Sequence, residues 1–371
     1  MAHPGRNCKL MNTLAKRLRD EMEQHGPMTF RRFMEMALYE PELGYYERAV
    51  IGREGDFQTN VSVGPLFGEL LAWQFGEWLQ EESGKGRTPM IVEAGAHDGR
   101  AAADILGALH VWSPSLAERV RYCVLDPSMK RRDWQRASLS KWENQICWIK
   151  DWEELEIAVT GIIFSNELLD ALPFHRFAWN RAEWRWCEMG VNWEAGQFTW
   201  QRMPQNSVVY APALPEGLHK VLPDGFLTEH CPAAEDWWSK AANALASGVV
   251  MTFDYGLDAS EFFAPHRAQG TARGYYKHRQ ETDVLREPGE QDLTAHVNYT
   301  SIRQAGEKSG LVTLADDSQE RFLTRVFLKL VKAAPVSEEW TAERSGAFQT
   351  LTHPDHFGRS FRVLAQSKTK S

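Results

Sequence analysis

The sequence predicts an α/β fold, a doubly wound and mostly parallel Rossmann-like sheet with an N-terminal helical extension and a β-rich insertion. Three observations support this prediction. Short apolar runs alternate with helical patterns from residue 90 onward, which favours a parallel sheet. A glycine-bearing turn follows the first of those runs, and acidic residues follow several others. In such sheets, ligands bind at the carboxyl ends of the strands.

The composition is that of an ordinary soluble globular protein. The chain has 371 residues, a net charge of −8 and 43% hydrophobic residues. Because nucleic-acid-binding proteins usually present a basic face, the acidic balance argues against that function. No apolar run approaches the ~20 residues of a membrane span. Five cysteines without metal-ligand spacing indicate neither a disulfide framework nor a zinc site, and we expect a cytoplasmic protein.

The N-terminal part is expected to be helical. Apolar periodicity predicts helices at 12–25 and 29–38, with Thr29 as the N-cap of the second. A loop rich in glycine and aromatic residues follows. A third helix is predicted from about Pro65 to Gln80.

The core strands are short apolar runs. They are predicted at 90–94, 120–126, 146–150, 160–165 and 248–254, with helices in the first two intervals. Two closing strands are expected at 311–314 and 361–365, flanking a helix near 318–332.

Two long segments interrupt this core. Tryptophans alternate with polar residues between 174 and 211, which predicts strands with one buried face, and a helix is expected near 232–246. Residues 256–300 show little periodicity, and a loop of that length usually binds or covers a ligand. We therefore expect three parts: an N-terminal helical and loop region covering the active site (1–88), a core (89–173 and 247–371) with a lid-like excursion (256–300), and a Trp-rich β insertion plus helix (174–246).

The first candidate site is the turn Glu93-Ala94-Gly95-Ala96-His97-Asp98-Gly99, at the junction of a strand and a helix. Such a turn lets backbone N–H groups and the positive end of a helix approach a ligand. Asp126 closes the next strand, where a carboxylate can accept hydrogen bonds from ribose hydroxyls. The turn lacks the central glycine of a dinucleotide fingerprint, and Asp126 lies beyond the usual ~20-residue spacing. The adenosyl group of S-adenosylmethionine therefore fits better than NAD; a plain turn without a ligand is the alternative.

The second candidate is the segment that follows the strand at 160–165. Asn166 ends this strand, and Glu167 and Asp170 are spaced to share one face of the following turn. The carboxyl-end rule predicts that all three face the crevice. The alternative is that Asn166 caps a helix and the two acids only suit its dipole.

Two further segments complete the set. Asp254 and Tyr255 close the strand at 248–254, and the long excursion contains Asp292 and His296, candidates for a substrate wall. His278 and His296 could form a metal pair, but hydrogen-bonded structural histidines are commoner, so no metal site is predicted.

These segments occur in order with further short motifs: Tyr39-x-Pro41-x-x-Gly44-Tyr45-Tyr46, Gly55-Asp56-Phe57-x-Thr59, Phe67-Gly68-Glu69, Asn166-Glu167 to Asp170-Ala171-Leu172-Pro173, Asp254-Tyr255-Gly256, Gly270-Thr271, Pro288-Gly289 and Asp292-Leu293-Thr294-Ala295-His296-Val297. Together they resemble the MidA-like family, formerly a domain of unknown function, which includes a mitochondrial complex I assembly protein that methylates arginine. The resemblance covers nearly the whole chain. It implies a class I methyltransferase fold, S-adenosylmethionine as cofactor and protein arginine as the methyl acceptor, with a link to complex I assembly.

The resemblance also suggests roles for the candidate residues. Asn166, Glu167 and Asp170 would be catalytic, because carboxylates can bind a guanidinium in a fork and accept its proton. The expected cofactor-binding residues are Glu93, Gly95, Ala96, Gly99, Asp126, Asp151, Trp152, Gly55, Asp56, Phe57 and Thr59. The expected substrate-binding residues are Asp254, Tyr255, Asp292 and His296.

One departure keeps alternatives open. His97 stands where the family usually has its central glycine, so its imidazole is expected to narrow the cofactor pocket or to add a hydrogen bond. An inactive or weakly active methyltransferase-like scaffold is therefore an alternative, as is an oxidoreductase on the same architecture. We expect a protein substrate, no nucleic acid, no membrane insertion, and a homodimer or heteromer through the Trp-rich insertion. The expected location is cytoplasmic, or mitochondrial if the source is a eukaryote.

Overall fold

The computed structural model describes residues 12–48, 59–83, 88–204, 211–214, 217–276, 279–333 and 340–368. The chain divides into two compact units. Unit 1 comprises Met1–Ala49, Pro173–His230 and Ala268–Leu293, and unit 2 comprises Val50–Leu172, Cys231–Arg267 and Thr294–Ser371. Compactness alone does not define folding domains, so the three-part division expected from the sequence stays a prediction.

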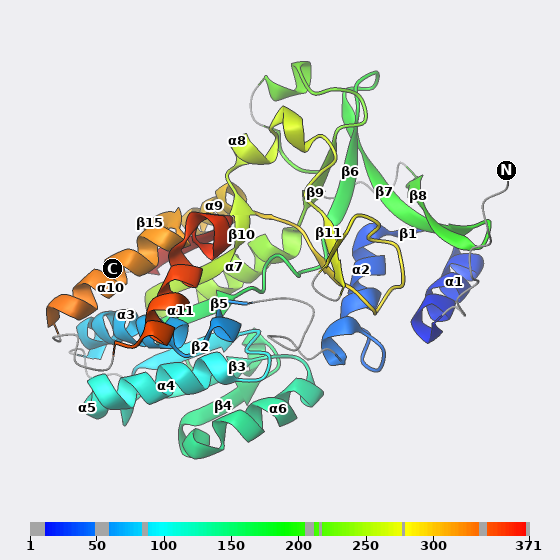
Figure 1. Cartoon of the computed structure of the whole chain (residues 1–371). Coiled ribbons are helices and arrows are strands. Elements are labelled where there is room, and N and C mark those ends of the chain that lie inside the picture. The colour runs from blue at the N-terminus through cyan, green and yellow to red at the C-terminus, as the bar shows by residue number, and fades with distance from the viewer. Residues whose placement is uncertain are drawn as a thin grey trace. The chain divides into compact units, whose positions relative to one another are not determined.

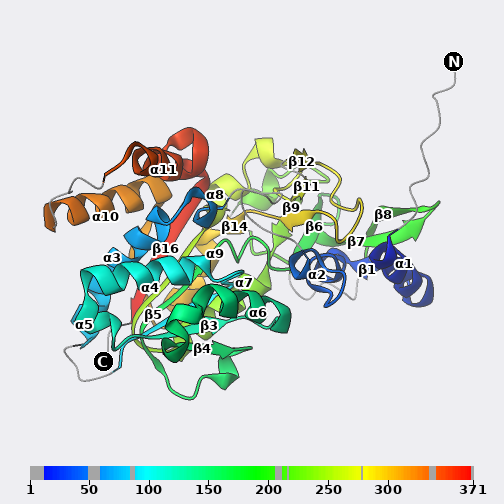
Figure 2. The ribbon, with the colours of Figure 1, turned by 60° about the horizontal axis from the view of Figure 1, so that its bottom comes forward.

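Unit 2 contains an eight-stranded sheet (Figures 1 and 2). Its strands are β2 (Met90–Ala94), β3 (Arg121–Leu125), β4 (Ile146–Ile149), β5 (Val159–Asn166), β10 (Leu245–Leu257), β14 (Val297–Asn298), β15 (Val312–Ser318) and β16 (Phe361–Lys368). The order is β15-β16-β10-β5-β2-β3-β4, with β14 beside β10. Strands β4, β3, β2, β5 and β10 run parallel, whereas β16 is antiparallel to both of its neighbours. The predicted mostly parallel sheet and both closing strands are confirmed.

Helices cover both faces of this sheet. They are α3 (Leu66–Ser83), α4 (Arg100–Trp112), α5 (Pro114–Ala117), α6 (Met129–Leu139), α7 (Pro232–Ala244), α8 (Ala259–Phe262), α9 (Tyr299–Lys308), α10 (Gln319–Ala333) and α11 (Ala342–Thr352). Helices α3, α4 and α10 pack on one face, where Phe67, Leu106 and Phe322 enter the core. Helices α7 and α9 pack on the other, with Trp238 and Ile302. Because both faces are covered, the central strands are rich in apolar residues, which is why they could be predicted from the sequence.

Unit 1 contains a five-stranded antiparallel sheet. Its strands are β1 (Met28–Thr29), β6 (His175–Asn180), β7 (Arg185–Glu194), β8 (Gln197–Arg202) and β9 (Leu227–His230), in the order β1-β7-β6-β9 with β8 beside β7. The strand prediction for the Trp-rich segment is confirmed.

Two helices accompany this sheet, α1 (Thr13–His25) and α2 (Phe30–Tyr39), as expected. The Oγ1 of Thr29 accepts a hydrogen bond from the Arg32 N–H, which confirms the predicted N-cap. Phe30 of α2 packs against Phe174 and Trp200, with ring centroids 5.3 and 5.0 Å away.

The excursion at 256–300 holds more structure than its sequence suggests. Besides α8, it contains β11 (Arg273–Tyr276), β12 (Arg279–Glu281) and β13 (Asp292–Thr294), which form a three-stranded sheet in the order β12-β11-β13. Strands of three or four residues are too short to show an alternating pattern, so they were not predicted. The role of this segment as a lid stays a prediction. Within the described ranges, every helix is too short or too polar to cross a bilayer.

The strand order fixes where a ligand can bind. From β2 the chain proceeds to β3 and β4 on one side and then returns to β5 on the other side of β2. Crossover connections diverge at such a switch point, and ligands bind at the carboxyl ends of the strands that flank it. The ends of β2 and β5 carry Glu93 and Asn166, two of the predicted site residues.

Candidate functional site

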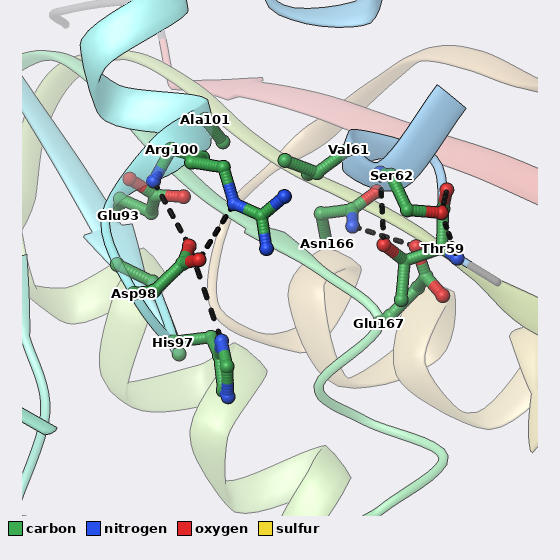
Figure 3. Close-up of a pocket in the computed structure, with 12 residues that line it drawn as sticks. Thr59, Val61, Ser62, Glu93, His97, Asp98, Arg100, Ala101, Asn166 and Glu167 are labelled. Carbon is green, nitrogen blue, oxygen red and sulfur yellow. Dashed lines mark hydrogen bonds and ion pairs between the residues drawn. The ribbon is translucent and has the colours of Figure 1, made fainter. Parts of the chain in front are cut away.

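A cavity lies in unit 2 at the carboxyl ends of β2 and β5 (Figure 3). Its lining residues are Thr59, Val61, Ser62, Glu93, Gly95, Ala96, His97, Asp98, Arg100, Ala101, Asn166 and Glu167. Six of these were predicted from the sequence, namely Thr59, Glu93, Gly95, Ala96, Asn166 and Glu167. The cavity volume is about 80 Å³. Pockets that enclose a drug-sized ligand measure roughly 300 Å³ or more. A larger ligand therefore requires side chains of the lining to turn aside.

The glycine turn brings backbone close to β5. Gly95 and Gly99 have φ angles of 73° and 83°, in the left-handed region that favours glycine. A Cβ atom at Gly95 would lie 2.9 Å from the Cδ1 of Leu168, so a side chain would also crowd the segment after β5. Gly99 is the N-cap of α4 and leaves the start of that helix facing the cavity.

His97 occupies a strained position in this turn. Its φ angle of 44° is uncommon for a residue other than glycine. Its side chain is 21% exposed, its Nδ1 lies 3.9 Å from the Oδ1 of Asp98, and its ring centroid lies 5.7 Å from that of Trp134. Its Nε2 is buried and has no hydrogen-bond partner among the described residues. The imidazole lines the cavity, as the departure from the family motif suggested.

Glu93 supplies a buried carboxyl group at the end of β2. Its side chain accepts a hydrogen bond of 2.7 Å from the hydroxyl of Tyr122. Burial raises the pKa of Glu93 to about 7, although the Tyr122 hydrogen bond opposes this shift. Near neutral pH the group is therefore poised between its neutral and ionised forms. A cationic ligand in the cavity would favour the ionised form.

Asn166 and Glu167 are held together at the end of β5. The Nδ2 of Asn166 donates to the Oε1 of Glu167 at 2.9 Å, and the N–H of Asn60 donates to the same oxygen at 2.8 Å. The backbone N–H of Glu167 donates to the carbonyl of Phe253 at 2.9 Å. No helix follows Asn166 in this described segment, which excludes the alternative of a simple helix cap.

Asp170 and Asp254 lie behind this segment and are buried, with exposed fractions of 6% and 0%. The Oδ2 of Asp254 accepts hydrogen bonds from the backbone N–H groups of Leu168, Leu169 and Asp170 at 3.2, 2.8 and 3.4 Å. Burial raises the pKa of Asp254 to about 7. Asp254 therefore fixes the turn that follows Asn166. Its predicted contact with substrate stays a prediction.

Asp126 is buried in a network of its own. Its carboxylate forms an ion pair with Arg131, with Nη2 to Oδ1 at 2.7 Å, and accepts from the Nε2 of Gln135 at 2.9 Å. Asp151 is exposed and accepts from the N–H groups of Glu153 and Glu154. Trp152 packs against Trp237 with ring centroids 5.8 Å apart. None of these three lines the cavity as the described residues define it, so their cofactor roles stay predictions.

The remaining predicted residues are dispersed. The ring of Tyr255 packs against Phe361 at a centroid distance of 4.0 Å. Asp292, in unit 1, accepts a hydrogen bond of 2.7 Å from the hydroxyl of Tyr46, and His296 is half-buried in unit 2. Gly55, Asp56 and Phe57 lie outside the described residues. The described residues hold no group of three or more His, Cys, Asp or Glu side chains arranged to bind a metal ion.

Comparison with known proteins identifies the family. Residues 70–315 match the family described as "putative S-adenosyl-L-methionine-dependent methyltransferase". The chain belongs to this methyltransferase family. The fold, the S-adenosylmethionine cofactor and the enzyme class expected from the sequence are thereby confirmed.

Individual relatives of this methyltransferase extend over nearly its whole length. A crystal structure of a "superfamily member and likely methyl transferase" from Burkholderia thailandensis, bound to S-adenosyl-homocysteine, is 31% identical, covers 96% of this chain and 92% of its own, and superposes with a TM-score of 0.82. The mitochondrial protein arginine methyltransferase NDUFAF7 homolog of Drosophila melanogaster is 27% identical over 95% of this chain and 84% of its own length. Human mitochondrial protein arginine methyltransferase NDUFAF7 is 25% identical over 95% of this chain and 82% of its own length.

The residues of this methyltransferase suit its cofactor. S-Adenosylmethionine carries a sulfonium and an ammonium, and the buried Glu93 offers a carboxylate to a cation in the cavity. The buried Nε2 of His97 offers a hydrogen bond that no described residue uses. The positive φ angle of Gly95 lets the backbone of the turn form part of the cavity lining. The chemistry of the lining therefore fits, while its volume requires movement of side chains.

The structure also brings residues into this site that were not predicted. Arg100 lines the cavity and its Nε donates to Asp98 at 2.6 Å (Figure 3); its position directly after Gly99 was a usable signal. Tyr122 reaches Glu93 from the neighbouring strand β3. Asn60 hydrogen-bonds to both Asn166 and Glu167, and Gln319 in turn hydrogen-bonds to Asn60. These residues come from segments far apart in the sequence, and no local pattern marks them.

Proposed function

We propose that this methyltransferase transfers a methyl group from S-adenosylmethionine to an arginine side chain of a protein. The observation that carries the proposal is the placement of Glu167, with Asn166, in the wall of the same cavity as the glycine turn and Glu93. The names of the relatives support arginine as the acceptor, because those proteins are protein arginine methyltransferases.

In this proposal the glycine turn holds the cofactor. Glu93, Gly95, Ala96, Gly99 and Thr59 form its binding surface, and the guanidinium of Arg100 suits a carboxylate in the same cavity. Bound S-adenosylmethionine supplies a methyl group that its sulfonium already activates. The proposal extends to Asp126, Asp151 and Trp152 at the adenosyl end, and to Gly55, Asp56 and Phe57.

The acceptor nitrogen needs help from the protein. A guanidinium has a pKa above ~12 and is a poor nucleophile, because its positive charge is delocalised over three nitrogens. In our proposal, the Glu167 carboxylate binds two N–H groups of the guanidinium and takes a proton on one carboxylate oxygen as the new N–C bond forms. Asn166 orients the nitrogen. Asp170 is the second carboxylate that we propose for binding the guanidinium. Its carboxyl group hydrogen-bonds to that of Asp254.

Substitution of the two carboxylates tests this role. Glu167→Gln and Asp170→Asn are incubated with labelled S-adenosylmethionine and a lysate of the source organism, and labelled residues are identified by mass spectrometry. We expect turnover about 10²- to 10⁴-fold lower in Glu167→Gln, the range that general bases contribute. The control is Glu118→Gln, an exposed carboxylate of the same unit. Normal turnover in both variants would remove the carboxylates as bases, and label on residues other than arginine would overturn the acceptor.

Further parts of the proposal concern partners and place. We propose that the Trp-rich insertion mediates a homodimer or heteromer; Trp184 of this segment is 55% exposed. Light scattering of the wild type and of Trp184→Ser tests this, and a monomeric wild type would exclude the homodimer.

We also propose a cytoplasmic location, or a mitochondrial one with a link to complex I assembly if the source is a eukaryote, in keeping with the mitochondrial relatives. Cell fractionation distinguishes the two compartments.

A further inference from the structure

A series of three amide side chains, those of the buried Gln319 and Asn60 and the half-buried Asn166, ends on the carboxylate of Glu167. We propose that Asn60 and Gln319 are positioning residues, which hold Asn166 and Glu167 in the orientation that methyl transfer requires. The two residues come from opposite ends of unit 2, Asn60 beside the short helical turn Val61–Val63 and Gln319 at the start of α10. The inference rests on the proposed role of Glu167.

Asn60 contacts both Asn166 and Glu167. Its side chain is fully buried. Its backbone N–H donates to the Oε1 of Glu167 at 2.8 Å, and its Nδ2 donates to the Oδ1 of Asn166 at 2.9 Å. A single residue therefore fixes both the carboxylate and its neighbouring amide.

The segment around Asn60 is itself held in place. The N–H of Thr59 donates to the Oγ of Ser62 at 2.9 Å, and the N–H of Ser62 donates to the Oγ1 of Thr59 at 3.1 Å. These reciprocal bonds between Thr59 and Ser62, two of the residues labelled in Figure 3, close a tight turn that contains Asn60. The turn presents the Asn60 N–H as a fixed donor.

Gln319 anchors Asn60 from behind. Its side chain is also fully buried. Its Nε2 donates to the Oδ1 of Asn60 at 2.8 Å and to the carbonyl of Leu351 at 3.0 Å. Both hydrogens of this amide are therefore used, and the side chain of Asn60 cannot turn over without losing a bond.

The hydrogen bonds that link Gln319, Asn60, Asn166 and Glu167 all point the same way. A carboxylate only accepts, so the Nδ2 of Asn166 faces Glu167, the Nδ2 of Asn60 faces Asn166, and the Nε2 of Gln319 faces Asn60. Every amide donates toward Glu167, and aligned hydrogen bonds strengthen one another. Reversal of any one amide would bring two oxygens or two NH₂ groups together.

Glu167 needs this support because its backbone is strained. Its φ angle of 54° lies in the left-handed region, which residues other than glycine keep only where surrounding contacts hold them there. A residue in such a conformation relaxes when its contacts are removed. Without the bond from Asn60, the carboxylate would no longer be fixed against the acceptor.

Gln319→Met tests the inference, because methionine has a similar length but no donor. The matched control is Gln366→Met, since Gln366 is equally buried and hydrogen-bonds to Trp238, Arg303 and Thr313 in the same unit. We measure methyl transfer from labelled S-adenosylmethionine into source-organism lysate protein over a range of lysate concentrations, and S-adenosyl-homocysteine binding by calorimetry. For Gln319→Met we expect kcat about 10- to 100-fold lower, the effect of a misplaced reacting group, with KM and cofactor Kd little changed. Gln366→Met should lose stability but retain kcat.

Two further variants keep the test decisive if Gln319→Met folds poorly. Asn60→Asp keeps the size of the side chain but cannot donate to Asn166, so it should lower kcat to a similar degree. The double variant Gln319→Met with Glu167→Gln should be no slower than Glu167→Gln alone, because the two residues act as one unit.

The outcomes separate this inference from the function it rests on. Normal kcat in Gln319→Met and Asn60→Asp, beside an impaired Glu167→Gln, overturns the positioning role alone. Additive losses in the double variant also overturn it, because Gln319 would then act elsewhere. Normal kcat in Glu167→Gln overturns the carboxylate role and the inference together.

Discussion

Glu93 is expected to make cofactor binding depend on pH. Burial raises its pKa from 4.5 to about 7, so the carboxyl group is largely protonated at pH 6 and largely ionised at pH 8. S-Adenosylmethionine carries a positive sulfonium that S-adenosyl-homocysteine lacks. The affinity for S-adenosylmethionine should therefore rise as the pH rises through 7, and the affinity for S-adenosyl-homocysteine should rise less.

The size of the effect follows from the pKa. At pH 6 only about one molecule in ten has an ionised Glu93, whereas at pH 8 nearly all do, so the Kd for S-adenosylmethionine should fall about tenfold between these pH values.

The free energy of unfolding of the empty protein responds to pH in the opposite sense. A carboxyl group whose folded pKa is raised contributes stability below its unfolded pKa of 4.5, and this contribution is lost as the pH rises through 7. Removing the charge with Glu93→Gln should stabilise the empty protein at pH 8 by up to about 3 kcal/mol.

Calorimetric titration of both ligands from pH 6 to pH 8 tests this prediction, together with urea unfolding of the empty protein. The amino group of the ligand also titrates in this range, so Glu93→Gln is the control in which that contribution remains. Tyr122→Phe provides a second check. Its hydroxyl donates to Glu93 and lowers the pKa of that carboxyl, so its removal should move the midpoint to higher pH. Equal pH dependence in the wild type and Glu93→Gln would refute the reasoning.

Three other predictions concern the cofactor turn and its surroundings. His97→Gly should bind S-adenosyl-homocysteine more weakly, because the ligand loses the hydrogen bond that the buried Nε2 of His97 offers; tighter binding in calorimetry would mean that the imidazole only narrows the cavity. Asp126→Asn should lower the free energy of unfolding by about 3–5 kcal/mol, because Arg131 is left as a buried charge without its partner. The control is Asp133→Asn, at an exposed position, which should change the free energy of unfolding in urea titrations by less than about 0.5 kcal/mol. Equal losses in Asp126→Asn and Asp133→Asn would contradict the role of the buried ion pair. Arg100→Ala should weaken S-adenosyl-homocysteine more than 5′-methylthioadenosine, which lacks the carboxylate; equal losses in calorimetry would exclude that contact.

The sequence predicted most of the sheet and half of the cavity lining for a common reason. Strands covered on both faces are rich in apolar residues, so β2 and β5 stand out by their apolar runs, at 90–92 and 162–164. The residues at their ends then fall at one edge by the rule for parallel sheets, which brought Glu93, Asn166 and Glu167 together without knowledge of the fold.

The rest depended on which way side chains turn and on contacts across long sequence separations. The ribose contact expected of Asp126 stays a prediction; its carboxylate pairs with Arg131 on the following helix, and strand position alone does not reveal such a pairing. Asp254 was expected at a strand end, but β10 continues to Leu257, because its last residues pair with β14. The carboxylate of Asp254 accepts hydrogen bonds from the backbone N–H groups of Leu168, Leu169, Asp170 and Tyr255. Gln319 and Asn60 are separated by 259 positions, so only the folded chain shows that they meet.

The position of β16 has a consequence for synthesis. Strand β16 (residues 361–368) pairs with β10 on one side and with β15 on the other. Until these residues leave the ribosome, the strand between β10 and β15 is therefore missing from the sheet. Until then β10, which contains the turn-fixing Asp254, has an open edge, and β15 lacks its neighbouring strand. Unpaired edges invite association with other nascent chains. The emergence of β16 is therefore the event that pairs both of these strands, and chaperones that shield strand edges should act on the nascent chain before that moment.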